Sequence, residues 1–252
     1  QPMALDFPTE KPFDHNWKKM SYTFLAAPHK SHTTENSKMY EEGYDRFVFK
    51  ELEKGIHVGN MLHNIFEYLD FTDSTDWNKV IDISLQKFTA HKKEDYECWM
   101  KLFIENILNA KIKVGEEDSF ELKSVQNDVK VNELEFDFAI DEAFDIKALQ
   151  DLFLPSDPEF IYSGFGEVKG MMNGLVDLFF KHNDKYYILD WKSNFLGDAM
   201  EHYDEDKLTE AMNENNYHLQ YCIYTVAMKR FLESKLGDSF DYNKHFGGVI
   251  YL

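Results

Sequence analysis

Hydrophobic residues in the first half of the chain recur at helical spacing. From Gly59 onward they appear every three or four positions, which indicates a helix with one buried face. The same spacing predicts two further helices, one with Trp77–Leu85 and one with Tyr96–Ile107. Residues 1–46 are polar and proline-bearing, so we interpret them as an N-terminal linker or extension, partly loop, ahead of a domain over 47–252. The residues that define the first helix are Met61, Leu62, Ile65, Phe66 and Leu69.

Alternation with a period of two begins later and predicts strands with one buried face. It covers 134–140. Two apolar runs on either side of HNDK predict a hairpin over 174–192, and the chain ends in an apolar strand over 247–252. The remaining segments are predicted to be a short helix around 145–153, a connector over 154–170, an acidic loop with a short helix over 197–215, and a long helix from about 217 to 235. The order of elements predicts a mixed α/β domain with a helical N-terminal portion.

Composition limits the possible functions. The 252 residues include 27 basic and 46 acidic side chains, a formal charge of −19. This sign is wrong for a free-standing nucleic-acid binder, because cationic contacts supply most of the affinity for phosphates. Cys98 and Cys222 are the only cysteines, too few for a four-cysteine zinc or iron–sulfur site, and we expect both to be buried and reduced. No apolar run reaches membrane-spanning length and no signal peptide is recognisable, so we expect a cytoplasmic protein without membrane contact.

The hairpin over 174–192 carries the candidate chemistry. If Asn183 and Asp184 form a two-residue turn, each cross-strand pair sums to 367, and Asp177 lies opposite Asp190. The period of two then puts Lys192 on the same face as Asp190. Two facing carboxylates within apolar strands repel each other and are costly to bury, and a divalent cation between them removes that cost.

The acid–x–Lys triplet alone carries little information, since it starts at seven positions: Glu121, Asp128, Asp145, Glu167, Asp190, Glu205 and Glu233. Most copies are typical of a solvated face. The Asp190 copy differs because it ends the apolar run YYIL and has a second acid in the opposite apolar run.

These residues resemble the PD-(D/E)XK nuclease superfamily, in which an acid and then acid–x–Lys on the next strand bind magnesium. Within it, the chain resembles the RecB-type nuclease domains of helicase–nucleases. The similar segments are WKKMSYTFLA, GNMLHNIFEYLDF, GLVDLFF…YYILDWKSNFLG, YHLQYCIYTVAMKRFL and HFGGVIYL; similarity is weak over 72–132 and 140–170. The resemblance implies a restriction-endonuclease-like fold with a mixed central sheet flanked by helices.

The resemblance also implies roles for individual residues. Asp177 and Asp190 correspond to metal ligands and Lys192 to the catalytic lysine. His63 resembles the histidine that completes the metal site, to which we expect the Trp191 carbonyl to contribute. The resemblance implies further site residues that support the active site and the DNA strand: Gln220 and Tyr224 in a Gln-x-x-x-Tyr helix, and either Glu133 or Glu135. The expected cofactor is Mg²⁺, and we expect Mn²⁺ to substitute because imidazole suits manganese better.

The function implied is hydrolysis of DNA at single- or double-stranded ends, in DNA end processing and recombinational repair. No Gly-x-x-x-x-Gly-Lys-Ser/Thr phosphate loop is present, and the chain stops at Leu252 in an apolar strand. We therefore expect the C-terminal domain of a longer protein whose helicase portion, with RecC- and RecD-like subunits, holds the DNA. The alternatives are a related AddA-type or stand-alone RecB-like exonuclease, and a nuclease-like fold that is inactive and serves as a DNA-binding or assembly module.

Overall fold

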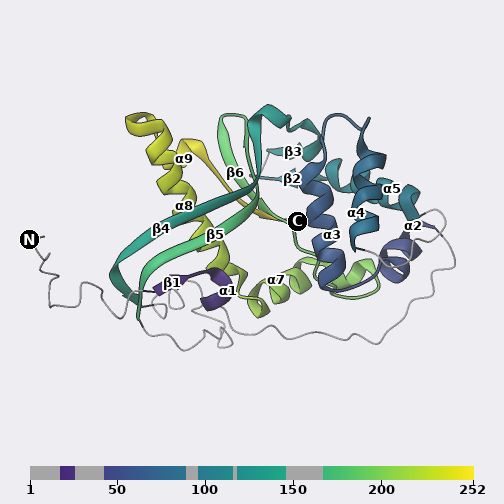
Figure 1. Cartoon of the computed structure of the whole chain (residues 1–252), viewed down its shortest axis with the longest axis horizontal. Coiled ribbons are helices and arrows are strands. Elements are labelled where there is room, and N and C mark those ends of the chain that lie inside the picture. The colour runs from purple at the N-terminus through teal and green to yellow at the C-terminus, as the bar shows by residue number, and fades with distance from the viewer. Residues whose placement is uncertain (1–17, 26–42, 89–95, 116–117, 146–166) are drawn as a thin grey trace, which may run out of the picture.

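The structure is a computed structural model that describes residues 18–25, 43–88, 96–115, 118–145 and 167–252. A mixed β-sheet lies at its centre, with helices α3, α4 and α5 on one side and α8 on the other (Figure 1). The predicted fold class, a mixed α/β domain with a central sheet flanked by helices, is confirmed.

The sheet is built around the long strand β5, Glu167–His182. Strand β4, Lys130–Asp145, pairs with it in antiparallel fashion along one edge. Two strands share the opposite edge: β1, Lys18–Met20, lies parallel to the beginning of β5, and β6, Lys185–Asp190, lies antiparallel to its end. The last strand, β7, Phe246–Tyr251, runs parallel to β6. Strand β1 thus joins the sheet from within the predicted N-terminal extension.

The turn between β5 and β6 forms at the predicted residues. Asn183 and Asp184 have φ values of 47° and 63°, the left-handed region that a two-residue hairpin turn requires. The pairing of His182 with Lys185 follows, and the register continues to Leu178 opposite Leu189. The hydrogen-bonded ladder ends there, one pair before Asp177 and Asp190.

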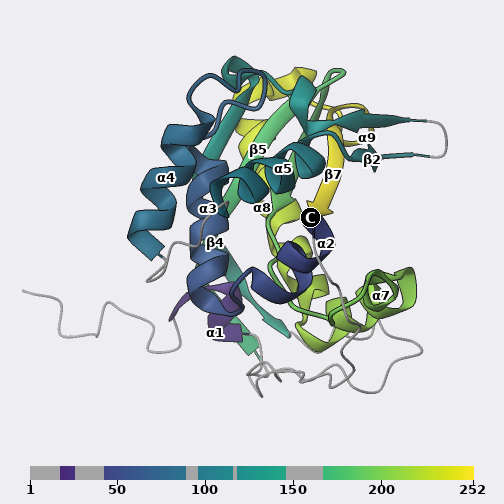
Figure 2. The same cartoon turned by 90° about the vertical axis from the view of Figure 1, so that its right-hand side faces the viewer.

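Three helices cover one face of the sheet: α3, Ile56–Tyr68; α4, Trp77–Phe88; and α5, Tyr96–Leu108. Figure 2 shows α5 in front of β5, with α3 and α4 to its left. Their apolar faces form the largest core cluster together with side chains of β5 and β6. The three predicted helices are confirmed, because each carries the helical stripe of apolar residues that the cluster buries.

The other face is covered by α8, Tyr217–Leu236, whose Tyr224, Met228 and Leu232 pack against Val176, Phe179 and Ile188. This confirms the long helix. Preceding it is α7, Glu205–Glu214, which Asp204 caps by accepting a hydrogen bond from the Lys207 amide. The shorter elements are α1 Tyr22–Leu25, α2 Tyr44–Arg46, the π-helix η1 Phe47–Glu51, β2 Lys111–Lys113, β3 Ser119–Glu121, α9 Tyr242–His245, and the 3₁₀ turns Leu122–Ser124, Asn127–Val129, Met200–Tyr203 and Gly237–Ser239.

Burial of Cys98 was predicted wrongly. On α5 the buried positions are Tyr96, Met100, Ile104 and Leu108, and Cys98 falls between the first two, so its thiol lies on the exposed face. Cys222 is half-buried. The predicted helix around 145–153 and most of the connector over 154–170 lie outside the described residues. Within the described part, each helix is too short or too polar to span a membrane.

Candidate active site

A cavity of about 670 Å³ opens at the edge of β5 between its two neighbours, β1 and β6. Strand β1 pairs with β5 as far as Met172, and β6 pairs with it from Leu178 onward. Among the residues that the structure describes, none pairs with 173–177 on this edge, and four of these five line the cavity. Asp177 lies in this gap and lines the cavity.

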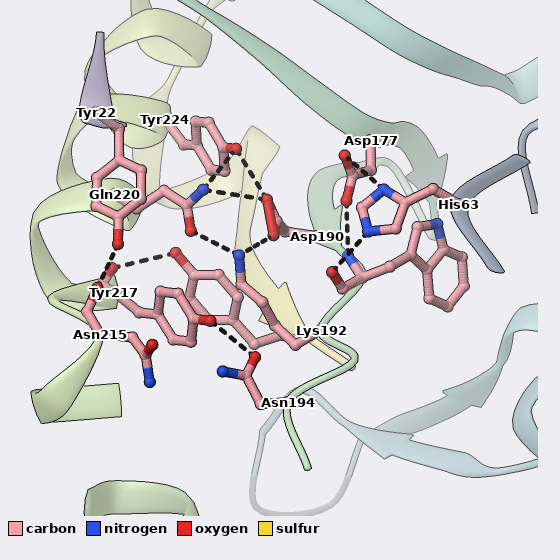
Figure 3. A network of polar contacts seen from close by, with 12 residues as sticks. Tyr22, His63, Asp177, Asp190, Lys192, Asn194, Asn215, Tyr217, Gln220 and Tyr224 are labelled. Atoms are coloured by element: carbon pink, nitrogen blue, oxygen red, sulfur yellow. Dashed lines mark hydrogen bonds and ion pairs between the residues drawn. The ribbon is translucent and has the colours of Figure 1, made fainter. Parts of the chain in front are cut away.

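An acidic group lies at one end of this cavity. One ligand atom from each of His63, Glu133 and Asp177 lies within 4.8 Å of the others. The Asp177 carboxylate accepts a hydrogen bond of 2.8 Å from the Trp191 amide, and its second oxygen is 3.5 Å from His63 Nδ1. The other ring nitrogen of His63 is 3.1 Å from the Trp191 carbonyl oxygen. Figure 3 shows the imidazole of His63 beside the Asp177 carboxylate.

Glu133 reaches this group because the backbone of β4 changes direction there. Its φ of 50° is unusual for a residue other than glycine. On one side of it Asn132 donates to the Glu67 carbonyl on α3, and on the other Leu134 packs against the cluster beneath α8. A regular strand would send Asn132 and Leu134 to the same face. Between Glu133 and Glu135, which the sequence left undecided, the geometry brings Glu133 to His63 and Asp177; Glu135 also lines the cavity.

The electrostatics of the group favour a bound cation. Burial raises the pKa of Glu133, and the nearby Asp177 and Glu67 raise it further. Burial lowers the pKa of His63, but its hydrogen bond to Asp177 and the surrounding carboxylates outweigh burial, so the net pKa is raised. Carboxylate and carbonyl oxygens with one imidazole nitrogen form a donor set that suits Mg²⁺ or Mn²⁺.

A second cluster centres on Asp190 (Figure 3). One carboxylate oxygen forms an ion pair with Lys192 Nζ. The other is 2.8 Å from the Tyr224 hydroxyl and 3.3 Å from Gln220 Nε2, while Gln220 Oε1 accepts from Lys192 at 3.0 Å. Burial raises the pKa of Asp190; Lys192 opposes this shift and Asp177 adds to it. The Tyr224 hydroxyl also lies 3.0 Å from the Leu175 carbonyl, in the stretch of β5 between its pairings with β1 and with β6.

Aromatic rings surround the ammonium of Lys192. It lies 4.2 Å from the ring centre of Tyr217 and 5.1 Å from that of Tyr251, and these two rings stack on each other. The Tyr217 hydroxyl is fixed by Asn194 at 2.8 Å and the Tyr251 hydroxyl by the Tyr217 carbonyl at 3.1 Å. Ring faces attract cations, so this arrangement limits where the ammonium can point.

All the sequence-predicted site residues except Glu133 line one cavity, but their polar groups form two clusters. Asp190 is not in the group with His63 and Asp177, because its carboxylate is engaged by Lys192, Gln220 and Tyr224. Of the acid–x–Lys copies, the one at Glu205 lies exposed on α7, as expected for a solvated face. The aromatic residues around Lys192 carry no signal of this role in the sequence, since each one also fits an apolar core.

A mixed sheet flanked by helices, with one acid in β5 and acid–x–Lys at the end of β6, is the arrangement of the PD-(D/E)XK nucleases. No family model matches the chain. Several known proteins are similar to it in sequence. The chain is 35% identical over 208 residues to the RecBCD enzyme subunit RecB of Escherichia coli K12. The aligned residues cover 80% of the chain and 17% of that relative.

Two other relatives bear the same name. The RecBCD enzyme subunit RecB of Haemophilus influenzae is 34% identical over 209 residues, or 80% of the chain and 16% of the relative. The RecB of Borreliella burgdorferi is 29% identical over 264 aligned residues, or 96% of the chain and 22% of the relative. The chain belongs to the RecB family, as a RecB-type nuclease domain, and it spans less than a quarter of the length of these relatives.

Proposed function

We propose that the domain hydrolyses phosphodiester bonds of DNA with a divalent metal ion, as the nuclease part of a RecB-type helicase–nuclease. The observation that carries this proposal is the presence, in one cavity, of the metal-donor group around Asp177 and the Asp190–Lys192 pair. A metal-ligand group alone suits many proteins. A half-buried lysine beside it supplies the positive charge that a phosphoryl transition state needs.

The expected metal ligands are His63, Asp177, Asp190 and the Trp191 carbonyl, and the position of Glu133 makes it a further candidate. A bound Mg²⁺ or Mn²⁺ would polarise the phosphate and lower the pKa of a coordinated water. To become a ligand, Asp190 would turn toward the metal, or share with it, one of its two oxygens, of which one now pairs with Lys192 and the other accepts from Tyr224 and Gln220. We expect it to be the oxygen that now pairs with Lys192, because the released ammonium can then contact the phosphate.

The residues of the chain have separate tasks in this reaction. Lys192 orients the attacking water and offsets the charge that builds up on the phosphate oxygens. Gln220 and Tyr224 hold Asp190 and Lys192 in place through the hydrogen bonds described above. His63 and Asp177 hold the backbone of Trp191 through its carbonyl and its amide.

The wider proposal concerns the partners and the biological role. The charge of −19 opposes DNA binding by the domain alone. A helicase portion of the same protein, together with RecC- and RecD-like subunits, would hold the DNA and deliver a strand to the cavity during end processing and recombinational repair. The name that the relatives share, a subunit of the RecBCD enzyme, supports this proposal.

The test is cleavage of end-labelled linear single-stranded DNA at low salt with Mg²⁺, Mn²⁺ or EDTA. We compare the wild type with Asp190→Ala and Lys192→Ala. The matched control is Lys207→Ala, which alters the exposed acid–x–Lys copy on α7. Cleavage that requires metal, is lost in both site variants and persists in the control is the expected result.

Thermal unfolding with and without Mn²⁺ separates the other outcomes. An inert wild type that Mn²⁺ still stabilises, but only with Asp177 and Asp190 intact, would mean that cleavage requires the motor or its partners. An inert wild type that no metal stabilises would overturn the active-site assignment and favour a binding or assembly module.

A further inference from the structure

The end of the cavity away from Asp177 is formed by the segment that begins with β1. Lys19, Ser21, Tyr22 and Thr23 all line it. Residue 19 faces Met171 in the register of β1 with β5. At about 3.3 Å per residue, the six steps along β5 from Met171 to Asp177 extend about 20 Å. The segment that begins with β1 therefore lies far along β5 from the metal-donor group around Asp177.

The segment is fixed firmly against the rest of the domain. Met20 and Leu25 are buried at 1% and 2% exposure in a cluster with residues of α8. The Tyr22 hydroxyl donates to the Asn215 carbonyl at the corner before α8. Gly170 has a φ of 140°, and a Cβ there would lie 1.9 Å from the Lys18 carbonyl oxygen, so only glycine lets β1 approach this closely. The cavity wall at this end is therefore preformed.

The side chains that this wall presents suit an anion. Lys19 makes no ion pair with any residue that the structure describes, whereas Lys192, the other lysine of the cavity, is paired with Asp190. Lys19 and Ser21 are two residues apart in an extended segment, so they point to the same side, opposite the buried Met20.

The hydroxyls beside Lys19 have a donor to spare. Ser21 Oγ and Thr23 Oγ1 are 3.0 Å apart, and Ser21 Oγ also accepts from the Phe24 amide. One hydroxyl donates to the other, so whichever donates, the pair keeps one hydroxyl hydrogen for an outside acceptor. Glu135 and Asp137 line the cavity from β4, so an anion bound here needs a cation and donors close to it.

We infer that Lys19, Ser21 and Thr23 form a second phosphate subsite, which binds a backbone phosphate of the DNA strand several nucleotides from the bond that is cut. The inference rests on the proposed function and adds a binding site to it. Its role is to align the strand along the gap in β5 between β1 and β6, so that the scissile phosphate reaches Asp177 and Lys192.

The test compares two substrates, end-labelled oligothymidylate and bis(p-nitrophenyl) phosphate, a small diester with no second phosphate. The variants are Lys19→Ala, the double variant Ser21→Ala/Thr23→Ala, and Lys19→Arg as the conservative exchange. The control is Lys111→Ala, an exposed lysine in the short strand β2, beside the buried Ile112 and away from the cavity.

Loss of one charge-assisted contact should raise the KM for oligothymidylate about tenfold at low salt, with kcat little changed. The slope of log KM against log salt should fall by about 0.7 for Lys19→Ala, the value for one contact to a single strand. Lys19→Arg should restore both quantities. With the small diester, variants and wild type should not differ.

Fluorescence anisotropy of labelled oligothymidylate in EDTA tests the subsite without catalysis. If the wild type cleaves but Lys19→Ala keeps its KM and salt slope, or loses activity equally on both substrates, the inference is overturned. If the wild type cleaves neither substrate, the proposed function fails, and the anisotropy measurement alone then decides whether the phosphate subsite exists. Weaker binding with a smaller salt slope in Lys19→Ala would uphold the subsite, and unchanged binding would reject it.

Discussion

Replacing Asp190 by Asn places an amide where Lys192 now meets a carboxylate. Asp190 is 4% exposed and the Lys192 side chain 19%, so water can do little to replace the lost partner. An amide can still accept from Tyr224 with its oxygen, but its N–H groups would then face the ammonium. The result is a half-buried cation that has lost its counter-charge.

The magnitude follows from the burial of the pair. Breaking a buried ion pair by removing one partner costs about 3–5 kcal/mol, and the partial exposure of Lys192 puts Asp190→Asn near about 3 kcal/mol. Lys192→Met leaves the Asp190 carboxylate buried with its bonds to Tyr224 and Gln220, and it should cost about 2–3 kcal/mol. In the double variant neither charge is stranded, so we expect a coupling free energy of about 2 kcal/mol.

The assay is urea unfolding in EDTA, followed by circular dichroism, for the wild type, both single variants and the double variant. The matched control is Lys181→Met and Asp184→Asn, an ion pair in the same hairpin whose partners are 40% and 92% exposed. Solvated pairs of this kind should show no measurable coupling. Additive effects of Asp190→Asn and Lys192→Met, or a gain of stability on Asp190→Asn alone, would refute the reasoning.

Three further outcomes are expected. Tyr217→Leu removes the nearer ring from Lys192 and should lower kcat about tenfold, which corresponds to about 1–2 kcal/mol of cation–π attraction. Tyr217→Phe keeps the ring and should retain most of the wild-type kcat. Equal losses of kcat in the two variants would mean that the ring is merely structural. Mn²⁺ at about 100 times its Kd should raise the Tm of the wild type by about 5–10 °C, and calorimetry should find no rise in Asp177→Asn. Burial lowers the pKa of Lys130 to about 8, so Lys130 loses its proton at a lower pH in the folded state than in the unfolded state. The free energy of unfolding should therefore rise with pH as Lys130 deprotonates in the folded state. Because Lys130 is partly exposed, we expect a rise of about 1 kcal/mol between about pH 7.5 and pH 9.5 relative to Lys130→Met, measured by urea unfolding; parallel pH profiles would show that Lys130 does not cause it.

Most of the secondary structure follows from the chain's own periodicity. The stripe of α3 and the alternation in β4 are local patterns, because burial on one face of an element repeats with the period of that element. The turn at Asn183 and Asp184 is local too, since both residues tolerate positive φ. That turn sets the register of the hairpin, so the approach of Asp177 and Asp190 to the same end of it is also a property of sequence.

Burial of single positions was less predictable. An apolar residue such as Cys98 fits a core composition, but the phase of its helix puts it on the outer face. Glu133 and Glu135 have the same chemistry and the same place in the alternating pattern. Only the left-handed backbone at Glu133, visible in the fold, directs that one to His63.

By itself the sequence determined the elements, the hairpin and the identity of its charged residues, because each depends on neighbours a few positions away. The tertiary structure decided how those charges are grouped. His63 comes from α3, Gln220 from α8 and Lys19 from β1, and contacts between residues so distant along the chain depend on how the sheet is ordered. The gap between β1 and β6 on β5 is such a feature: no local pattern encodes it, and it opens the cavity in which both clusters lie.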